Sequence, residues 1–148
     1  LQYEPFLEDE LVTIVKAAGN ESLPEELTPH DLCRLPLVLR EQGSGTLEVI
    51  ETGLERHGIK LSELNVRIRL GSTEAIKAFL RHSRSVGIVS VFSVREELAR
   101  GVFRVIDITG LSFIRHFSFV ASAGKDSPLT EKFKDFTRRS IITAGYRV

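Results

Sequence analysis

Two short loops carry the side chains in this sequence that are best suited to binding a small charged molecule. One runs from Arg40 to Thr46 and the other from Leu70 to Thr73, and both are rich in Gly, Ser and Thr. Each follows a predicted strand and opens a predicted helix, where unpaired N–H groups and the partly positive end of the helix dipole attract anions. We therefore expect one shared anion site, lined by Arg40, Ser44, Gly45, Thr46, Ser72 and Thr73.

Each of these features has a plainer interpretation. Taken alone, either loop is more often an ordinary helix cap. Arg40 could bind a ligand carboxylate through two hydrogen bonds, or it could equally form an ion pair with the neighbouring Glu41. The first loop lacks the lysine and the glycine spacing of a Walker phosphate loop, and Ser44 is not in a G-x-S-x-G elbow.

The sequence offers no local pattern for catalysis, a metal or a cofactor. Its four histidines are scattered, and His30 with Cys33 on one short predicted helix falls far below what a metal site requires. A single cysteine excludes an intramolecular disulfide and favours a reducing compartment. We expect no enzyme activity, no metal site and no cofactor.

Strands and helices alternate along almost the whole chain. Period-two or β-branched patterns predict strands at 10–16, 35–40, 66–70, 86–92, 102–108 and 113–121. Helices are predicted at 28–34, 46–57, 72–80, 93–101 and from 127 onward, with Thr28 as N-cap of the first, and Ser93 and Glu96 as a capping box. This order predicts an α/β fold with a mainly parallel sheet.

Composition narrows the classes of protein further. Hydrophobic residues make up 42% and charged residues 27% of 148 residues, which suits a folded domain. Lys and Arg together equal Asp and Glu at 20 each, so this chain alone is not expected to bind DNA. No apolar run is long enough for a membrane span. The absence of methionine suggests a piece of a longer, cytoplasmic protein.

Several segments together resemble the effector-binding domain of LysR-type bacterial transcriptional regulators. They are 36–41 followed by Gly43-Ser44-Gly45-Thr46, then 71–77, 87–89 and 96–98. The resemblance implies a fold like the periplasmic binding proteins, in which a small ligand bound between two lobes modulates transcription. The two loops described above predict that this ligand is an anionic metabolite. It assigns 17–115 to a complete lobe two, 1–16 to a remnant of lobe one with the first crossover, and 116–148 to the second crossover with the C-terminal part of lobe one. A solute-binding protein of a transport system, with the same fold, is the alternative.

The resemblance also implies partners and a departure from the family. Such regulators are homo-oligomers that contact DNA through an N-terminal helix-turn-helix, which this chain would lack. Many members have a glycine-rich turn where this chain has Ser83-Arg84-Ser85-Val86, so effector identity does not carry over. We expect the chain to self-associate, and we expect Gly53, inside a predicted helix, to allow close approach of another backbone.

Overall fold

The computed structural model describes residues 1–124 and 127–145. The chain divides into two compact units: unit 1 consists of Leu1–Asp9 with Ile114–Val148, and unit 2 is Glu10–Phe113. The candidate site lies in unit 2, and each unit is described by itself below.

Unit 2 is built on a sheet whose strands lie in the order β4-β3-β5-β1-β6. These strands are β1 (Gln2–Lys16, of which 10–16 belong to this unit), β3 (Leu37–Arg40), β4 (Val66–Leu70), β5 (Val86–Ser90) and β6 (Phe103–Val105). Strand β3 is parallel to both of its neighbours, whereas β1 is antiparallel to β5 and β6. The short strands β2 (Glu26–Leu27) and β7 (Asp107–Ile108) form a separate parallel pair.

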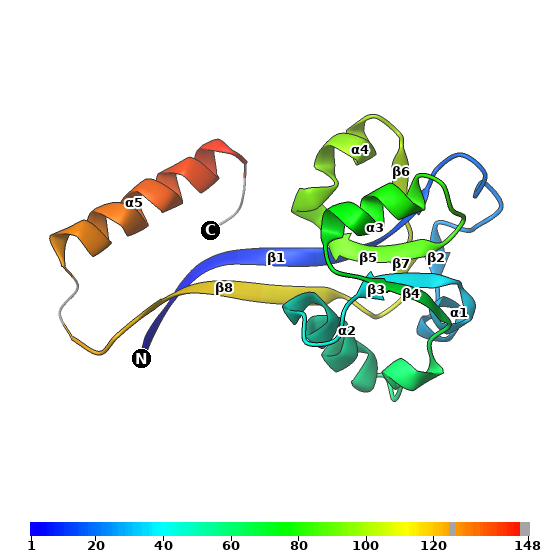
Figure 1. Cartoon of the computed structure of the whole chain (residues 1–148), viewed down its shortest axis with the longest axis horizontal. Coiled ribbons are helices and arrows are strands. Elements are labelled where there is room, and N and C mark those ends of the chain that lie inside the picture. Colours follow the sequence, from blue (N-terminus) through cyan, green and yellow to red (C-terminus); the bar gives the residue numbers. More distant parts are fainter. Residues whose placement is uncertain (125–126, 146–148) are drawn as a thin grey trace. The chain divides into compact units, whose positions relative to one another are not determined.

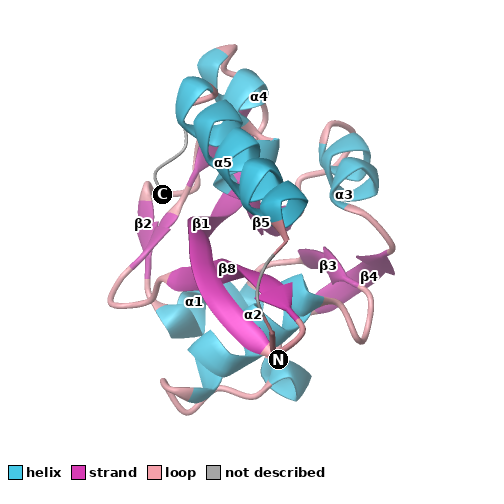
Figure 2. Ribbon diagram, turned by 90° about the vertical axis from the view of Figure 1, so that its left-hand side faces the viewer, coloured by secondary structure: helices cyan, strands magenta, loops and turns pink. Residues whose placement is uncertain are grey.

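Helices cover both faces of this sheet (Figures 1 and 2). Helices α1 (Pro29–Arg34) and α2 (Gly45–Glu55) lie on one face, and α3 (Thr73–Leu80) and α4 (Arg95–Ala99) lie on the other. Side chains alternate along β3, so that Leu37 and Leu39 join the core beneath α2 while Val38 joins the core beneath α3. Short 3₁₀ turns occupy Leu61–Glu63 and Val91–Ser93.

The α/β class with a mainly parallel sheet is confirmed, as are the elements that local chemistry defines most sharply. Helix α1 begins at the Thr28 cap, whose hydroxyl accepts the Asp31 N–H at 3.1 Å. Strand β4 and strand β8 (Phe113–Ala121) have the predicted limits. Gly58 follows α2 with φ +72°, the left-handed conformation that favours glycine after a helix.

Other predicted limits are wrong. Ser93 and Glu96 form no capping box, because α4 has Val94 rather than Ser93 at its N-cap position and lacks a side-chain cap. The Ser93 hydroxyl donates to the Ser90 carbonyl at 2.6 Å. The strand predicted at 86–92 ends at Ser90, where the 3₁₀ turn begins. The strand predicted at 102–108 is two strands, β6 and β7, which pair with different partners.

The expectation for Gly53 is also wrong. The space above it is filled from within the chain, since a Cβ added there would lie 2.7 Å from Cδ1 and 2.8 Å from Cε1 of Phe113. Near the end of the same helix, the imidazole Nε2 of His57 lies 2.9 Å from the Gly110 carbonyl oxygen. Gly53 therefore makes room for the aromatic ring that opens β8, rather than for another molecule.

Unit 1 consists of the start of β1, most of β8 and helix α5 (Pro128–Thr143). Strand β8 pairs with β1, and Arg115 holds the buried Asp9 carboxylate with its Nε and Nη2, both at 2.7 Å. The Lys134 Nζ lies 2.9 Å from the Glu4 carboxylate. Much of the apolar surface of α5 is exposed, with 60% of Phe133 and 70% of Phe136 accessible. Among the described residues, no helix is long and apolar enough to cross a membrane.

Candidate functional site

The two predicted loops lie at the same edge of the unit 2 sheet. Arg40 is paired with Leu70 in the parallel register of β3 and β4, and the Glu41 N–H donates to the Leu70 carbonyl at 3.2 Å. Both loops therefore leave adjacent strands at their C-terminal ends, which is where α/β sheets bind ligands. From this common edge, α2 and α3 run to opposite faces of the sheet (Figure 1).

Ser44 starts α2 through its side chain. Its hydroxyl oxygen accepts the Leu47 N–H at 3.1 Å, and the turn before it is closed by the Ser44 N–H, which donates to the Glu41 carbonyl at 3.2 Å. Gly43 within this turn has φ +86°, which a side chain would strain. Gly45 is exposed in the first helical position, whereas Thr46 is buried and only 7% accessible. Ser44 and Gly45 are therefore accessible from solvent, and the Thr46 side chain is not.

Ser72 caps the N-terminus of α3 in the same way. Its hydroxyl accepts the Ala75 N–H at 3.1 Å, and its carbonyl accepts the Ile76 N–H at 3.2 Å. Ser72 is exposed and Thr73 is half-buried. A capping hydroxyl that accepts from the helix still has its own O–H to donate. Both capping serines can therefore serve the helix and an anion at once.

The structure answers the question of what Arg40 contacts. Its Nε donates to Glu41 Oε2 at 2.8 Å and its Nη2 donates to Glu41 Oε1 at 3.0 Å, a two-pronged ion pair. This hydrogen bonding lowers the pKa of Glu41 and raises that of Arg40 relative to their ordinary values. The guanidinium at the strand end thus holds a carboxylate from its own chain.

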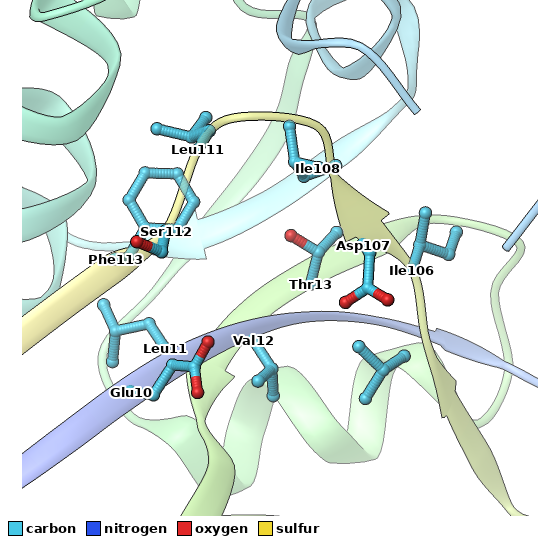
Figure 3. A pocket seen from close by; sticks show the side chains of 11 residues that line it. Glu10, Leu11, Val12, Thr13, Ile106, Asp107, Ile108, Leu111, Ser112 and Phe113 are labelled. Atoms are coloured by element: carbon cyan, nitrogen blue, oxygen red, sulfur yellow. The ribbon is translucent and has the colours of Figure 1, made fainter. Parts of the chain in front are cut away.

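Two cavities bear on where a ligand fits. One of about 190 Å³ lies beside the N-terminus of α2 and is lined by Gln42, Gly43, Ser44, Leu47, Glu48 and Glu51. The other, of about 30 Å³, lies between β1 and the segment 105–113, with Glu10, Thr13 and Asp107 among its lining residues (Figure 3). The second cavity has room for about one water molecule, so it does not hold a metabolite.

Lys77 is a buried charged residue that was not among the predicted site residues. Its Nζ donates to the Glu74 carboxylate at 3.0 Å and the Ser93 carbonyl at 2.7 Å, and it lies 2.8 Å from the Glu97 carboxylate. Burial alone would raise the pKa of Glu97, but the hydrogen bond from Lys77 lowers it below its ordinary value. Lys77 therefore joins α3 to the 3₁₀ turn that follows β5 and to α4. The spacing of Glu74 and Lys77 was the available signal.

Metal ligation finds no support in the part of the chain that the structure describes. No group of three or more His, Cys, Asp or Glu side chains is placed to hold a metal ion among those residues. The Cys33 thiol, which lies on the same short helix as His30, donates to the Pro29 carbonyl at 3.2 Å, and burial raises its pKa.

Comparison with known proteins identifies a matching family and similar sequences. The family model described as "LysR substrate binding domain" matches residues 1–141. A "RuBisCO operon transcriptional regulator" from Acidithiobacillus ferrooxidans is 31% identical over 134 residues, which is 90% of this chain and 42% of that protein. A "Phosphonates import ATP-binding protein PhnC" from Anaeromyxobacter dehalogenans is 34% identical over 142 residues, covering 95% of this chain but 28% of that protein. This chain thus spans less than half the length of these relatives.

Solved structures resemble this one closely. The regulatory domain of CcmR from Synechocystis PCC6803, in complex with 2-PG, has a TM-score of 0.78 and 28% identity, over 94% of this chain and 66% of that one. The effector-binding domain of QuiR, in complex with shikimate, has a TM-score of 0.70 at 18% identity, over 94% of this chain and 64% of that one. The second likeness shows the fold alone.

Proposed function

Because this chain belongs to the LysR substrate-binding domain family, we propose that it is the effector-sensing part of a LysR-type transcriptional regulator. It binds a small oxyanion at the edge of the sheet where β3 and β4 end. The observation that carries this proposal is the meeting of two serine-capped helices and one arginine at that edge.

The chemistry of the edge favours an anion over a neutral ligand. The first N–H groups of each helix have no partner within the helix, and the dipole makes this end partly positive. The hydroxyls of Ser44 and Ser72 add two donors. Arg40 supplies a planar fork that matches a carboxylate or phosphate group. The complex of CcmR with 2-PG supports a small effector of this kind.

We also propose how the rest of the chain and the whole regulator are arranged. We assign 17–115 to lobe two, with 1–16 and 116–148 as crossovers and part of lobe one. The whole regulator would be a cytoplasmic homo-oligomer that contacts DNA through a separate N-terminal helix-turn-helix. Regulation is favoured over solute transport because the A. ferrooxidans relative and the CcmR domain are described as regulators. A catalytic function finds no support in the described side chains of the edge.

A titration followed by ¹H–¹⁵N NMR tests the proposal. We expect 2-PG, added to millimolar concentration, to shift the amide signals of Gly45 and Thr73 in a saturable manner. Arg40→Gln should weaken binding at least about tenfold, since it removes a charged hydrogen-bonding partner. Arg34→Gln is the matched control, because the Arg34 carbonyl contacts Asn65 at the opposite end of β4. Equal affinity of the Arg40→Gln and wild-type chains would place the binding site elsewhere.

A further inference from the structure

The ion pair between Arg40 and Glu41 has an unusual origin. Consecutive side chains on a strand point to opposite faces, so neighbours cannot normally meet in a two-pronged contact. Here β3 ends at Arg40, and the chain turns at Glu41, so that both carboxylate oxygens reach Nε and Nη2 of the guanidinium at 2.8 and 3.0 Å. The Glu41 carboxylate therefore occupies the Nε–Nη2 edge of the guanidinium, one of the two edges at which Arg40 could bind an external oxyanion with two hydrogen bonds.

We propose that Glu41 is an internal competitor of the effector: its carboxylate occupies Arg40 in the free protein, and an incoming oxyanion takes its place. This inference rests on the proposed function, because it concerns the same edge of the sheet. It makes Glu41 a specificity-determining residue that the ligand does not need to contact.

The two parts of Glu41 differ in how firmly they are held. Its backbone is fixed on both sides, since its N–H donates to the Leu70 carbonyl and its carbonyl accepts the Ser44 N–H, each at 3.2 Å. Its side chain is 44% exposed and reaches Arg40, whose own side chain is 21% exposed. The two-pronged geometry strengthens this pair, but water can solvate the half-exposed carboxylate of Glu41 once it leaves Arg40. The carboxylate can thus leave Arg40 without disturbing the turn that starts α2.

The exchange selects a class of ligand. A carboxylate or phosphate group offers two oxygens in the same geometry, so it can replace both hydrogen bonds that Arg40 loses when Glu41 leaves. A neutral polar ligand cannot replace that pair, so it would leave Glu41 in position. Once displaced, the negatively charged Glu41 side chain lies near the bound anion and repels it. This repulsion keeps the affinity for the anion low and makes that affinity depend on the salt concentration.

The variant Glu41→Gln tests the competition directly. Glutamine keeps the size of the side chain but removes its charge, so we expect 2-PG and inorganic phosphate to bind about three- to tenfold more tightly than to the wild-type chain. Glu55→Gln is the matched control, since Glu55 is exposed at the opposite end of α2 and its replacement removes the same charge. Equal tightening in both variants would overturn the inference, because general electrostatics would then explain it.

A second measurement follows the carboxylate itself. The pKa of Glu41, measured from its side-chain ¹³C signal, is held low by Arg40 in the free protein and should rise toward its ordinary value at saturating 2-PG. Tightening by Glu41→Gln together with this rise supports the inference. If the wild-type chain binds 2-PG through Arg40 but Glu41→Gln changes nothing, the inference fails and the proposed function stands. If Arg40→Gln binds as well as wild type, both fail.

Discussion

Replacing Gly53 with alanine tests how tightly α2 is packed against the start of β8. In most exposed helical positions this change stabilises a protein, because alanine is favoured over glycine by about 1 kcal/mol. Here the new Cβ would lie 2.7 and 2.8 Å from two carbons of the Phe113 ring. Phe113 is only 3% exposed, so its ring cannot swing into solvent to make room. The steric effect should therefore outweigh the helix preference.

The expected magnitude follows from the two opposing effects. Forcing an extra methyl group into a packed core costs about 1–3 kcal/mol, and the gain in helix propensity offsets about 1 kcal/mol of this. We expect the free energy of unfolding of Gly53→Ala to fall by about 1 kcal/mol. Thr52→Ala is the control, because Thr52 is exposed in the same helix and its replacement adds propensity without a clash.

Urea unfolding, followed by circular dichroism, measures these differences. A double-mutant cycle with Phe113→Leu separates the clash from the propensity, since a smaller side chain leaves room for the methyl group. In the Phe113→Leu background, Gly53→Ala should be neutral or stabilising. The reasoning is refuted if Gly53→Ala stabilises the otherwise wild-type chain by as much as 1 kcal/mol, as an unpacked helical glycine would.

Two further regions give predictions of their own. Lys77→Met should lower the free energy of unfolding by about 2 kcal/mol at pH 7, because it leaves the nearly buried Glu97 without its closest cation. This loss should shrink as the pH falls below about 4.5, the ordinary pKa of a glutamate. The reason is that the lowered pKa of Glu97 stabilises the folded chain fully only above this pH, and the stabilisation is lost as the folded carboxylate becomes protonated. Urea unfolding of both chains at pH 7 and at pH 4 measures the change. The exposed rings of Phe133 and Phe136 should drive self-association at tens of micromolar, because burying each contributes about 1.5–3 kcal/mol. Sedimentation should show the wild-type chain as an oligomer and the double serine variant as a monomer, and a monomeric wild-type chain would contradict this.

What the sequence predicts well is what a few neighbouring residues determine. The cap of α1 needs only Thr28, Pro29 and Asp31, and all three lie within one turn. The strand–helix loops of the candidate site are likewise local, which is why Ser44 and Ser72 could be recognised as caps. Ser93 shows the limit of such patterns, because it ends a 3₁₀ turn and Val94, not Ser93, takes the N-cap position of α4.

Contacts between distant parts of the chain could not be predicted from the sequence. Nothing in the residues around Gly53 reveals that Phe113 fills the space above it. Lys77 lies on the apolar side of a helix, and only the fold brings it to Glu97 and to the Ser93 carbonyl. The partner of Arg40 could be proposed but not chosen, because the choice depends on how the chain turns after β3.

The energetics of the candidate edge determine what else an effector requires. Each helix N-terminus contributes about 0.3–1 kcal/mol to anion binding, each serine hydroxyl about 1 kcal/mol, and one charged contact to Arg40 about 1.5–3 kcal/mol. Together these reach about 4–7 kcal/mol before the cost of immobilising the ligand, whereas a micromolar complex requires about 8 kcal/mol. The competing Glu41 carboxylate reduces the contribution of Arg40 further. The edge therefore selects the charged group of an effector, and tight, selective binding needs additional contacts to the rest of that molecule.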